Sequence, residues 1–99
     1  MLSADAILYL ESEENYVHIV HLDGGKVKDY ELRSSMKALE ETLEQHGLVR
    51  CHRSYFVNPS HVTLVKKDPS GYALARLSHE GIKDIPVSKR YYDSLTALL

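Results

Sequence analysis

The stretch LVRCHRSYFVN, residues 48–58, has the apolar side chains of a β-strand but carries three basic residues around the only cysteine of the chain. The basic residues are Arg50, His52 and Arg53. Side chains alternate between the two faces of a strand, so a core-facing Cys51 places its two neighbours outward. Arg53 and Ser54 then fall at a kink, from which the Arg53 side chain projects. Charged groups in a strand must face water, pair with a partner or bind a ligand.

Short apolar segments separated by turn residues make up most of the chain. Alternating or β-rich patterns predict strands at residues 6–12, 16–22, 26–32, 48–52, 55–58, 61–67, 72–78 and 82–88. Gly and Pro mark several of the connections, as in Asp23-Gly24-Gly25 and Asp68-Pro69-Ser70-Gly71. Short strands joined by tight turns are typical of antiparallel sheets. We therefore expect a mainly β fold.

Two segments have the spacing of amphipathic helices. In residues 34–47, Ser34 or Ser35 is a candidate N-cap and Gly47 a stop signal. The apolar face of this helix consists of Met36, Leu39 and Leu43, and its outer face of Glu40, Glu41 and Glu44. Ser88 is the candidate cap of a C-terminal helix. The apolar face of this second helix consists of Tyr91, Leu95 and Leu98.

Length and charge limit the possible organisation. The chain has 99 residues, of which 43% are hydrophobic, enough for one compact domain and too few for two. Residues 1–47 carry four Lys or Arg against ten acidic residues, whereas residues 48–99 carry eight against four. If the fold keeps these halves apart, the second half attracts anionic partners.

Cysteine content and hydropathy favour one compartment. A single cysteine forms no internal disulfide, which fits a reducing environment. No stretch approaches the roughly 18 apolar residues of a membrane span, and the N-terminal segment has no basic leader. We expect a cytoplasmic protein that is neither exported nor embedded in a membrane.

The sequence offers little support for catalysis or metal binding. His18 and His21 are three residues apart, which places them on opposite faces of a strand, so they do not form a zinc-ligand pair. Cys51 and His52 diverge for the same reason, and a cysteine nucleophile needs a neighbouring base. Gly24-Gly25 lacks the lysine and helix of a phosphate loop. We expect no catalytic residue, metal or cofactor; a small hydrolase using Cys51 is the weaker alternative.

Basic residues also gather in PVSKRYY, residues 86–92, where Lys89 and Arg90 occupy the first turn of the predicted helix. Cations are unfavourable at the partly positive N-terminus of a helix, and a bound polyanion would offset both charges. One alternative is that these cations pair with Asp84 or Asp93 on the surface, and Arg53 with a glutamate of the predicted middle helix. Another is an interaction or sensor module whose positive half docks an acidic protein and does not bind nucleic acid.

Four segments together resemble the LytTR DNA-binding domain of bacterial transcriptional response regulators. They are LESEENYVHI (10–19), MKALEETLEQHG (36–47), RCHRSYFVN (50–58) and IPVSKRYYDSL (85–95). The similarity runs from about residue 5 to residue 98. It implies an elongated stack of small antiparallel sheets, with one middle and one C-terminal helix, that binds double-stranded DNA through loops. It also implies that residues 1–99 form the C-terminal module of a two-component regulator with an upstream receiver domain, and that two copies bind direct repeats in a promoter.

The resemblance implies DNA contacts in three places. These are Asn15 and Tyr16 between the first two strands, Arg53 after the family's histidine, and Lys89 and Arg90 after the PVS motif. Lys89 stands where arginine is common, which disfavours bidentate reading of guanine by this residue and favours either guanine reading by Arg90 or a phosphate contact. Glu13 and Glu14 would oppose phosphates unless they point away from DNA or accept a hydrogen bond from cytosine.

The resemblance also gives supporting roles to neighbouring residues. It implies that His52 and Asn58 hold the DNA-binding bend through hydrogen bonds, with Ser88 supporting the basic pair that follows it. Cys51 is most simply a small core residue, and a redox-sensing role is the alternative.

Overall fold

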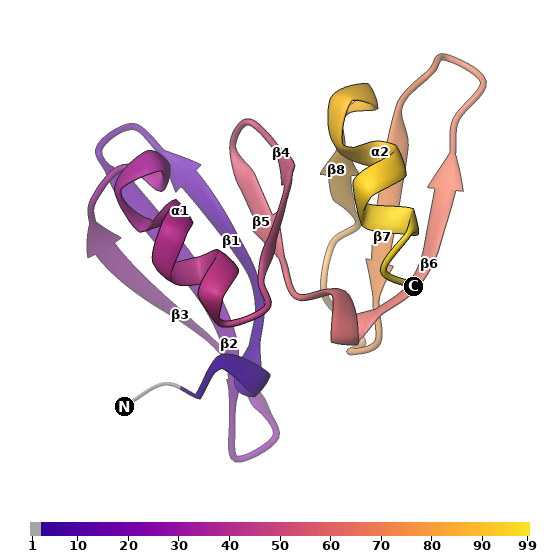
Figure 1. Cartoon of the computed structure of the whole chain (residues 1–99). Coiled ribbons are helices and arrows are strands. Elements are labelled where there is room, and N and C mark those ends of the chain that lie inside the picture. Colours follow the sequence, from indigo (N-terminus) through magenta and orange to yellow (C-terminus); the bar gives the residue numbers. More distant parts are fainter. Residues whose placement is uncertain (1–2) are drawn as a thin grey trace.

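The computed structural model describes residues 3–99, which form two antiparallel sheets and two α-helices (Figure 1). The first sheet contains β1 (Ile7–Glu13), β2 (Tyr16–Asp23), β3 (Lys26–Arg33), β4 (Val49–His52) and β5 (Tyr55–Val57), in the order β3-β2-β1-β5-β4. The second contains β6 (Val62–Lys67), β7 (Ala73–Leu77) and β8 (Ile85–Val87), in that order. The helices are α1 (Met36–Gln45) and α2 (Lys89–Thr96), with short 3-10 helices η1 (Ala4–Ala6) and η2 (Pro59–His61).

The predicted mainly β fold is confirmed, and α1 and α2 lie where the apolar spacing places them. The Ser35 side chain accepts a hydrogen bond from the Ala38 N–H, which fixes the start of α1. After α1, Gly47 adopts φ 84°, a left-handed conformation that glycine tolerates best. Leu98 departs from the prediction, because α2 ends at Thr96 and this side chain is 57% exposed.

Residues 48–58 do not form one kinked strand. His52 pairs with Tyr55, so Arg53 and Ser54 form a tight turn that reverses the chain between β4 and β5. The register of the two strands shifts between Arg50 and His52, which makes a bulge at Cys51. Arg53 therefore lies at the tip of a hairpin, whereas the sequence predicted a kink at this position.

The central strands of the first sheet are covered on both faces. On one face, α1 contributes Met36 and Leu43 to a cluster with Phe56 of β5. On the other face, Val57 packs in a cluster that includes the second sheet and Leu95 of α2. Successive residues of β5 are thus fully buried on opposite sides, which explains the unbroken apolar runs in the central strands.

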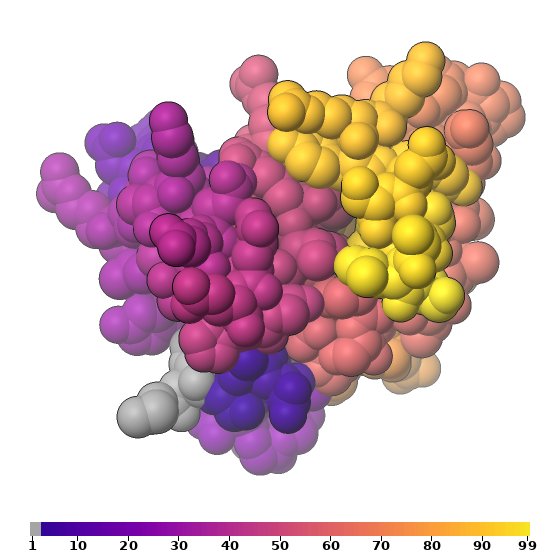
Figure 2. Space-filling view, viewed as in Figure 1, coloured from indigo at the N-terminus to yellow at the C-terminus, as the bar shows by residue number. Residues whose placement is uncertain are grey.

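The acidic and basic halves of the sequence occupy different sides of the molecule. The strands β1 to β3 and α1 lie on one side, and β6 to β8 and α2 on the other, with β4 and β5 between them (Figure 1). The space-filling view shows the same separation on its visible face, from the indigo and magenta half to the orange and yellow half (Figure 2). The molecule measures 38 × 28 × 23 Å, so the charge asymmetry extends along an elongated shape.

Candidate nucleic-acid interface

The three segments expected to contact DNA lie at the same end of the molecule (Figure 1). They are the β1–β2 turn, the β4–β5 turn and the start of α2. Backbone hydrogen bonds join them: the Ser12 N–H donates to the Ser54 carbonyl at 2.9 Å, and the Ser88 N–H donates to the Cys51 carbonyl at 2.9 Å. The relative positions of the segments are therefore fixed by main-chain contacts.

The β1–β2 turn consists of Glu14 and Asn15, both exposed. Glu14 adopts φ 56°, the left-handed conformation that two-residue hairpin turns require. The Asn15 carbonyl accepts a hydrogen bond from the Ser34 N–H at 3.1 Å, which ties the turn to the segment before α1. Tyr16 is 38% exposed. The side chains of Asn15 and Tyr16 are thus available to a ligand at this end of the sheet.

Glu13, at the end of β1, does not extend toward the turn. Its carboxylate lies 3.3 Å from the Nε2 atom of His18 on β2. Glu13, one of the two glutamates that would oppose phosphates, therefore lies over the face of the sheet beside His18.

The β4–β5 turn is held by Arg50. The Nη2 atom of this guanidinium donates to the Arg53 carbonyl at 2.6 Å, and its Nε atom to the His52 carbonyl at 3.4 Å. Its Nη1 atom donates to the Glu40 carboxylate on α1 at 2.8 Å. Glu40 was expected on the outer face of its helix, and it instead reaches β4. Arg50 is thus neutralised inside the structure, whereas the exposed Arg53 side chain forms no ion pair within residues 3–99.

His52 acts as a hydrogen-bond acceptor inside this turn. The Ser54 N–H donates to its Nδ1 atom at 3.1 Å, and its ring contacts Tyr55 edge-on with centroids 5.6 Å apart. Partial burial, followed by the charges of Arg53 and Arg50, lowers the pKa of His52 below its usual value. A neutral ring therefore supports the turn.

Asn58 lies at the other end of β5, away from the turn. Its Nδ2 atom donates to the carbonyls of Ile7 at 2.9 Å and Ala4 at 3.2 Å. Its Oδ1 atom accepts hydrogen bonds from the backbone and the hydroxyl of Ser60. This 7% exposed side chain joins η1 to the end of β5 and has no contact with the bend.

The start of α2 presents two cations. Ser88 occupies the N-cap position, but its side chain forms no capping hydrogen bond, and its backbone N–H binds β4 instead. Lys89 and Arg90 are exposed and form no ion pair in the described part of the chain, while Asp84 pairs with Arg76 at 3.5 Å. The expected alternative, in which Asp84 or Asp93 neutralises the basic pair, is not what the structure shows.

Sequence reasoning missed a fourth basic segment at this end. The β6–β7 turn reaches the same side of the molecule as the start of α2 (Figure 1). The exposed Lys66 and Lys67 precede this turn, and the ammonium of Lys67 lies 5.1 Å from the ring centroid of Tyr92 on α2. Two adjacent lysines before a turn are the signal that could have identified the segment.

Cys51 is fully buried beside these segments. Burial raises the pKa of its thiol to about 12. The thiol contacts the Tyr55 carbonyl at 3.7 Å. Because the reactive form of cysteine is the thiolate, this environment opposes both redox sensing and nucleophilic chemistry at neutral pH.

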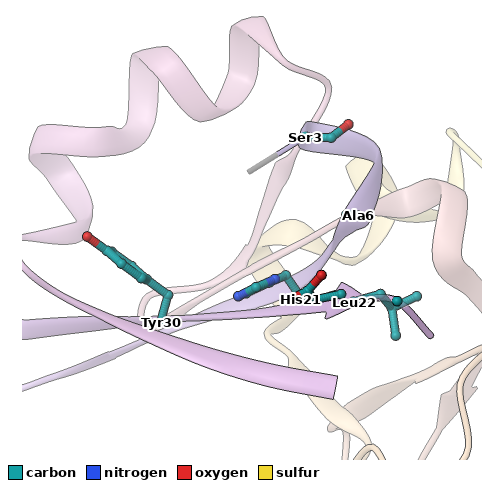
Figure 3. Close-up of a pocket in the computed structure, with 7 residues that line it drawn as sticks. Ser3, Ala6, His21, Leu22 and Tyr30 are labelled. Atoms are coloured by element: carbon teal, nitrogen blue, oxygen red, sulfur yellow. The ribbon is translucent and has the colours of Figure 1, made fainter. Parts of the chain in front are cut away.

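A hollow of about 760 Å³ lies at the opposite end of the first sheet, between η1 and the β2–β3 turn (Figure 3). Its lining includes Ser3, Ala6, His21, Leu22 and Tyr30. His21 is buried there, and its Nδ1 atom has no hydrogen-bond partner among the described residues.

Within residues 3–99, no group of three or more His, Cys, Asp or Glu side chains is placed to hold a metal ion. Nor does any helix in that range have the length and apolar character to cross a membrane.

Comparison with known proteins gives consistent matches. The family model described as the LytTr DNA-binding domain matches residues 1–99. A response regulatory protein of Vibrio cholerae is 30% identical over 71 residues, which are 72% of this chain and 27% of that protein. A second response regulatory protein of the same species is 40% identical over 65 residues, which are 66% of this chain and 25% of that protein. The chain thus spans about a quarter of each of these relatives.

A solved structure has the same fold. It is the LytTr DNA-binding domain of a response regulator from Bacillus cereus, with a TM-score of 0.71 and 22% sequence identity. The similarity covers 96% of this chain and 82% of that one.

Proposed function

The chain belongs to the LytTr DNA-binding domain family, and we propose that it binds double-stranded DNA with sequence specificity through the three segments at one end of the molecule. The protein would act as the DNA-binding part of a bacterial transcription regulator, in the cytoplasm, without catalytic activity. The observation that carries this proposal is the set of exposed cations at that end, Arg53, Lys89 and Arg90, which form no ion pair with any residue that the structure describes.

The electrostatics of this end favour a polyanion. Two other cations near the β4–β5 turn are engaged, since Arg50 binds Glu40 and Lys83 binds Glu11 at 2.7 Å. The start of α2 adds the partial positive charge and free N–H groups of a helix N-terminus to the charges of Lys89 and Arg90. Surface cations without partners at such a position gain most from phosphate groups.

Each segment has a role that suits its side chains. Arg53, at the tip of a braced hairpin, is the candidate for bidentate recognition of guanine O6 and N7. Asn15 has the amide geometry for adenine, with Tyr16 beside it. Lys89 is assigned to phosphate, and Arg90 to guanine or phosphate. The loops would enter neighbouring grooves from one side of the duplex, with His52 supporting the β4–β5 turn and the Ser88 backbone joining the start of α2 to β4.

The matched relatives suggest a longer parent protein. They are response regulatory proteins of which this chain covers about a quarter. We infer that residues 1–99 are a single DNA-binding module at the C-terminus of a two-component regulator with a receiver domain upstream. Two copies would bind direct repeats in a promoter as a homodimer.

Selection of bound duplexes from a random pool, repeated at two salt concentrations, tests the proposal. We expect enrichment of a defined sequence. Fluorescence titration of that duplex should give an affinity that falls steeply with ionic strength, because several phosphate contacts release counterions. A scrambled duplex of the same length is the control for specificity.

The outcomes separate the possible functions. Equal binding of selected and scrambled duplexes would contradict sequence specificity. No binding of either duplex, together with binding of an acidic polypeptide such as polyglutamate, would replace the proposal with a protein-interaction module.

A further inference from the structure

We propose that His18 is a positioning residue for DNA binding: as an imidazolium it holds Glu13 on the face of the sheet, away from phosphates at the β1–β2 turn, so that DNA binding is coupled to proton uptake. This inference rests on the proposed function, because it assumes that the β1–β2 turn approaches DNA.

Three carboxylates surround the His18 ring. Its Nδ1 atom lies 3.2 Å from the Asp29 carboxylate on β3. Its Nε2 atom lies 3.3 Å from Glu13 on β1 and 3.9 Å from Glu31 on β3. Within residues 3–99, none of these carboxylates forms an ion pair with a lysine or an arginine. His18 is thus the group that can neutralise them.

The geometry favours the charged form of the ring. A neutral imidazole donates from one nitrogen and presents a lone pair at the other. With carboxylates at both nitrogens, the neutral ring of His18 would direct a lone pair at Asp29 or at Glu13. The imidazolium donates to Asp29 and places its positive charge beside Glu13. The charge and hydrogen bond of Asp29, with Glu13 and Glu31, accordingly outweigh partial burial and raise the pKa of His18.

Two other charged groups beside this cluster are paired, and the exposed Arg33, opposite Tyr16 on β3, adds a positive charge at this end of the sheet. Glu11 lies opposite His18 in the β1–β2 pairing, but its carboxylate binds Lys83 from the segment before β8. Lys83 also donates to the Tyr55 hydroxyl at 3.0 Å. Lys28 on β3 pairs with Asp23 at the far end of the sheet. Against these charges, the protonation of His18 changes the net charge next to the turn by one unit.

The cluster lies close to the turn in sequence and in space. Glu13 pairs with Tyr16 in the last rung of the β1–β2 ladder, directly beside Glu14 and Asn15. If His18 loses its proton, Glu13 loses the cation that holds it, and the carboxylates repel approaching phosphates. Bound phosphates, in turn, stabilise the imidazolium. Affinity for DNA is therefore expected to increase as the pH falls.

Protonation of His52 is expected to have the opposite effect on DNA affinity, and this limits the pH range of the test. Its Nδ1 atom accepts the Ser54 N–H, so protonation of His52 would disturb the β4–β5 turn. Because the pKa of His52 is lowered and that of His18 is raised from 6.5, measurements between pH 6.5 and 8.5 favour neutral His52 and report mainly on His18.

The test measures affinity for the selected duplex across this range at constant ionic strength. We expect the wild-type protein to bind about three- to tenfold more tightly at pH 6.5 than at pH 8.5, since one pKa unit corresponds to tenfold in affinity. H18Q should bind weakly at both pH values, and H18K tightly at both. His46, exposed at the end of α1, provides the control variant H46Q, which should keep the wild-type pH dependence.

Two further measurements distinguish positioning from a structural role. Adding E13Q to H18Q should restore affinity at pH 8.5, because it removes the carboxylate that His18 holds. Calorimetric titration in two buffers of different ionisation enthalpy should show proton uptake on binding by the wild-type protein and less by H18Q.

The outcomes separate this inference from the proposed function. If the wild-type protein binds no duplex, the proposed function is wrong. If it binds DNA and H18Q retains both its affinity and its pH dependence, then the proposed function stands and the role of His18 is wrong. If E13Q does not rescue H18Q although both variants unfold at the same temperature, the role of Glu13 is wrong.

Discussion

The Nη1 atom of Arg50 lies 2.8 Å from the Oε2 atom of Glu40, and this contact joins the β4–β5 turn to α1. The same guanidinium binds the carbonyls of His52 and Arg53. The helix thus stabilises the conformation of a turn at the proposed interface, although its outer face is acidic and unsuited to DNA.

Substitution R50A should reduce both stability and DNA affinity, whereas R53A should reduce affinity alone. Loss of charge-assisted hydrogen bonds from a half-buried arginine is expected to cost about 1–2 kcal/mol of unfolding free energy. Loss of the exposed Arg53 side chain should change the unfolding free energy by no more than about 0.5 kcal/mol. Urea unfolding and duplex titration of both variants measure the two effects. E40Q is the matched control, because it leaves the two carbonyl contacts of Arg50 in place. Equal stability of R50A and the parent would contradict the bracing role.

Arg53 and Lys89 should differ in what they contribute to binding. R53A is expected to cost about 1–3 kcal/mol of binding free energy and to relax preference at one base position. K89A should weaken all sequences alike and reduce the slope of log affinity against log salt by about one. Titrations of the selected duplex and its single-base variants, at several salt concentrations, separate these effects. An R53A protein that binds the selected duplex as tightly as the parent does would remove Arg53 from the interface.

The stability of the protein should depend on the protonation of His52. Burial, Arg53 and Arg50 lower the folded-state pKa, so the unfolded chain binds more protons below about pH 6.5. The stabilising contribution of His52 is therefore complete above that pH and is lost as the pH falls through the lowered folded-state pKa. H52N keeps an acceptor near the Nδ1 position and does not titrate.

Urea unfolding of the wild-type protein and H52N between pH 5.5 and 7.5 measures this contribution. The wild-type protein should lose more stability than H52N as the pH falls. Since the other histidines are common to both proteins, parallel curves would show that His52 makes no such contribution.

Cys51 should resist modification in the folded protein. Its thiol is fully buried, with a pKa of about 12, so little thiolate forms at neutral pH. Iodoacetamide is expected to react slowly with the native protein and rapidly in 6 M guanidinium chloride, as followed by mass spectrometry. C51A should leave DNA affinity unchanged. Rapid labelling without denaturant, or loss of DNA binding on mild oxidation, would favour the redox alternative.

Local patterns were sufficient to predict most elements of the fold. The alternation of side chains located the strands, and the spacing of Met36, Leu39 and Leu43 located α1, because both periods follow from backbone geometry. The same patterns could not distinguish a kink from a reversal at Arg53 and Ser54. Two polar residues fit either conformation, and the pairing of His52 with Tyr55 decides between them.

The sequence by itself determined the mainly β character, the two helices and the residue types suited to a polyanion, since these depend on neighbouring residues. Only the tertiary structure decided which of two nearby arginines is free. Arg50 meets Glu40, ten residues earlier in the chain, while Arg53 meets no carboxylate among residues 3–99. Likewise, the pairing of β1 with β5 and the contact of Ser88 with β4 bring the three proposed DNA-binding segments to one end. Such contacts join residues that are far apart in the chain, so no local pattern encodes them.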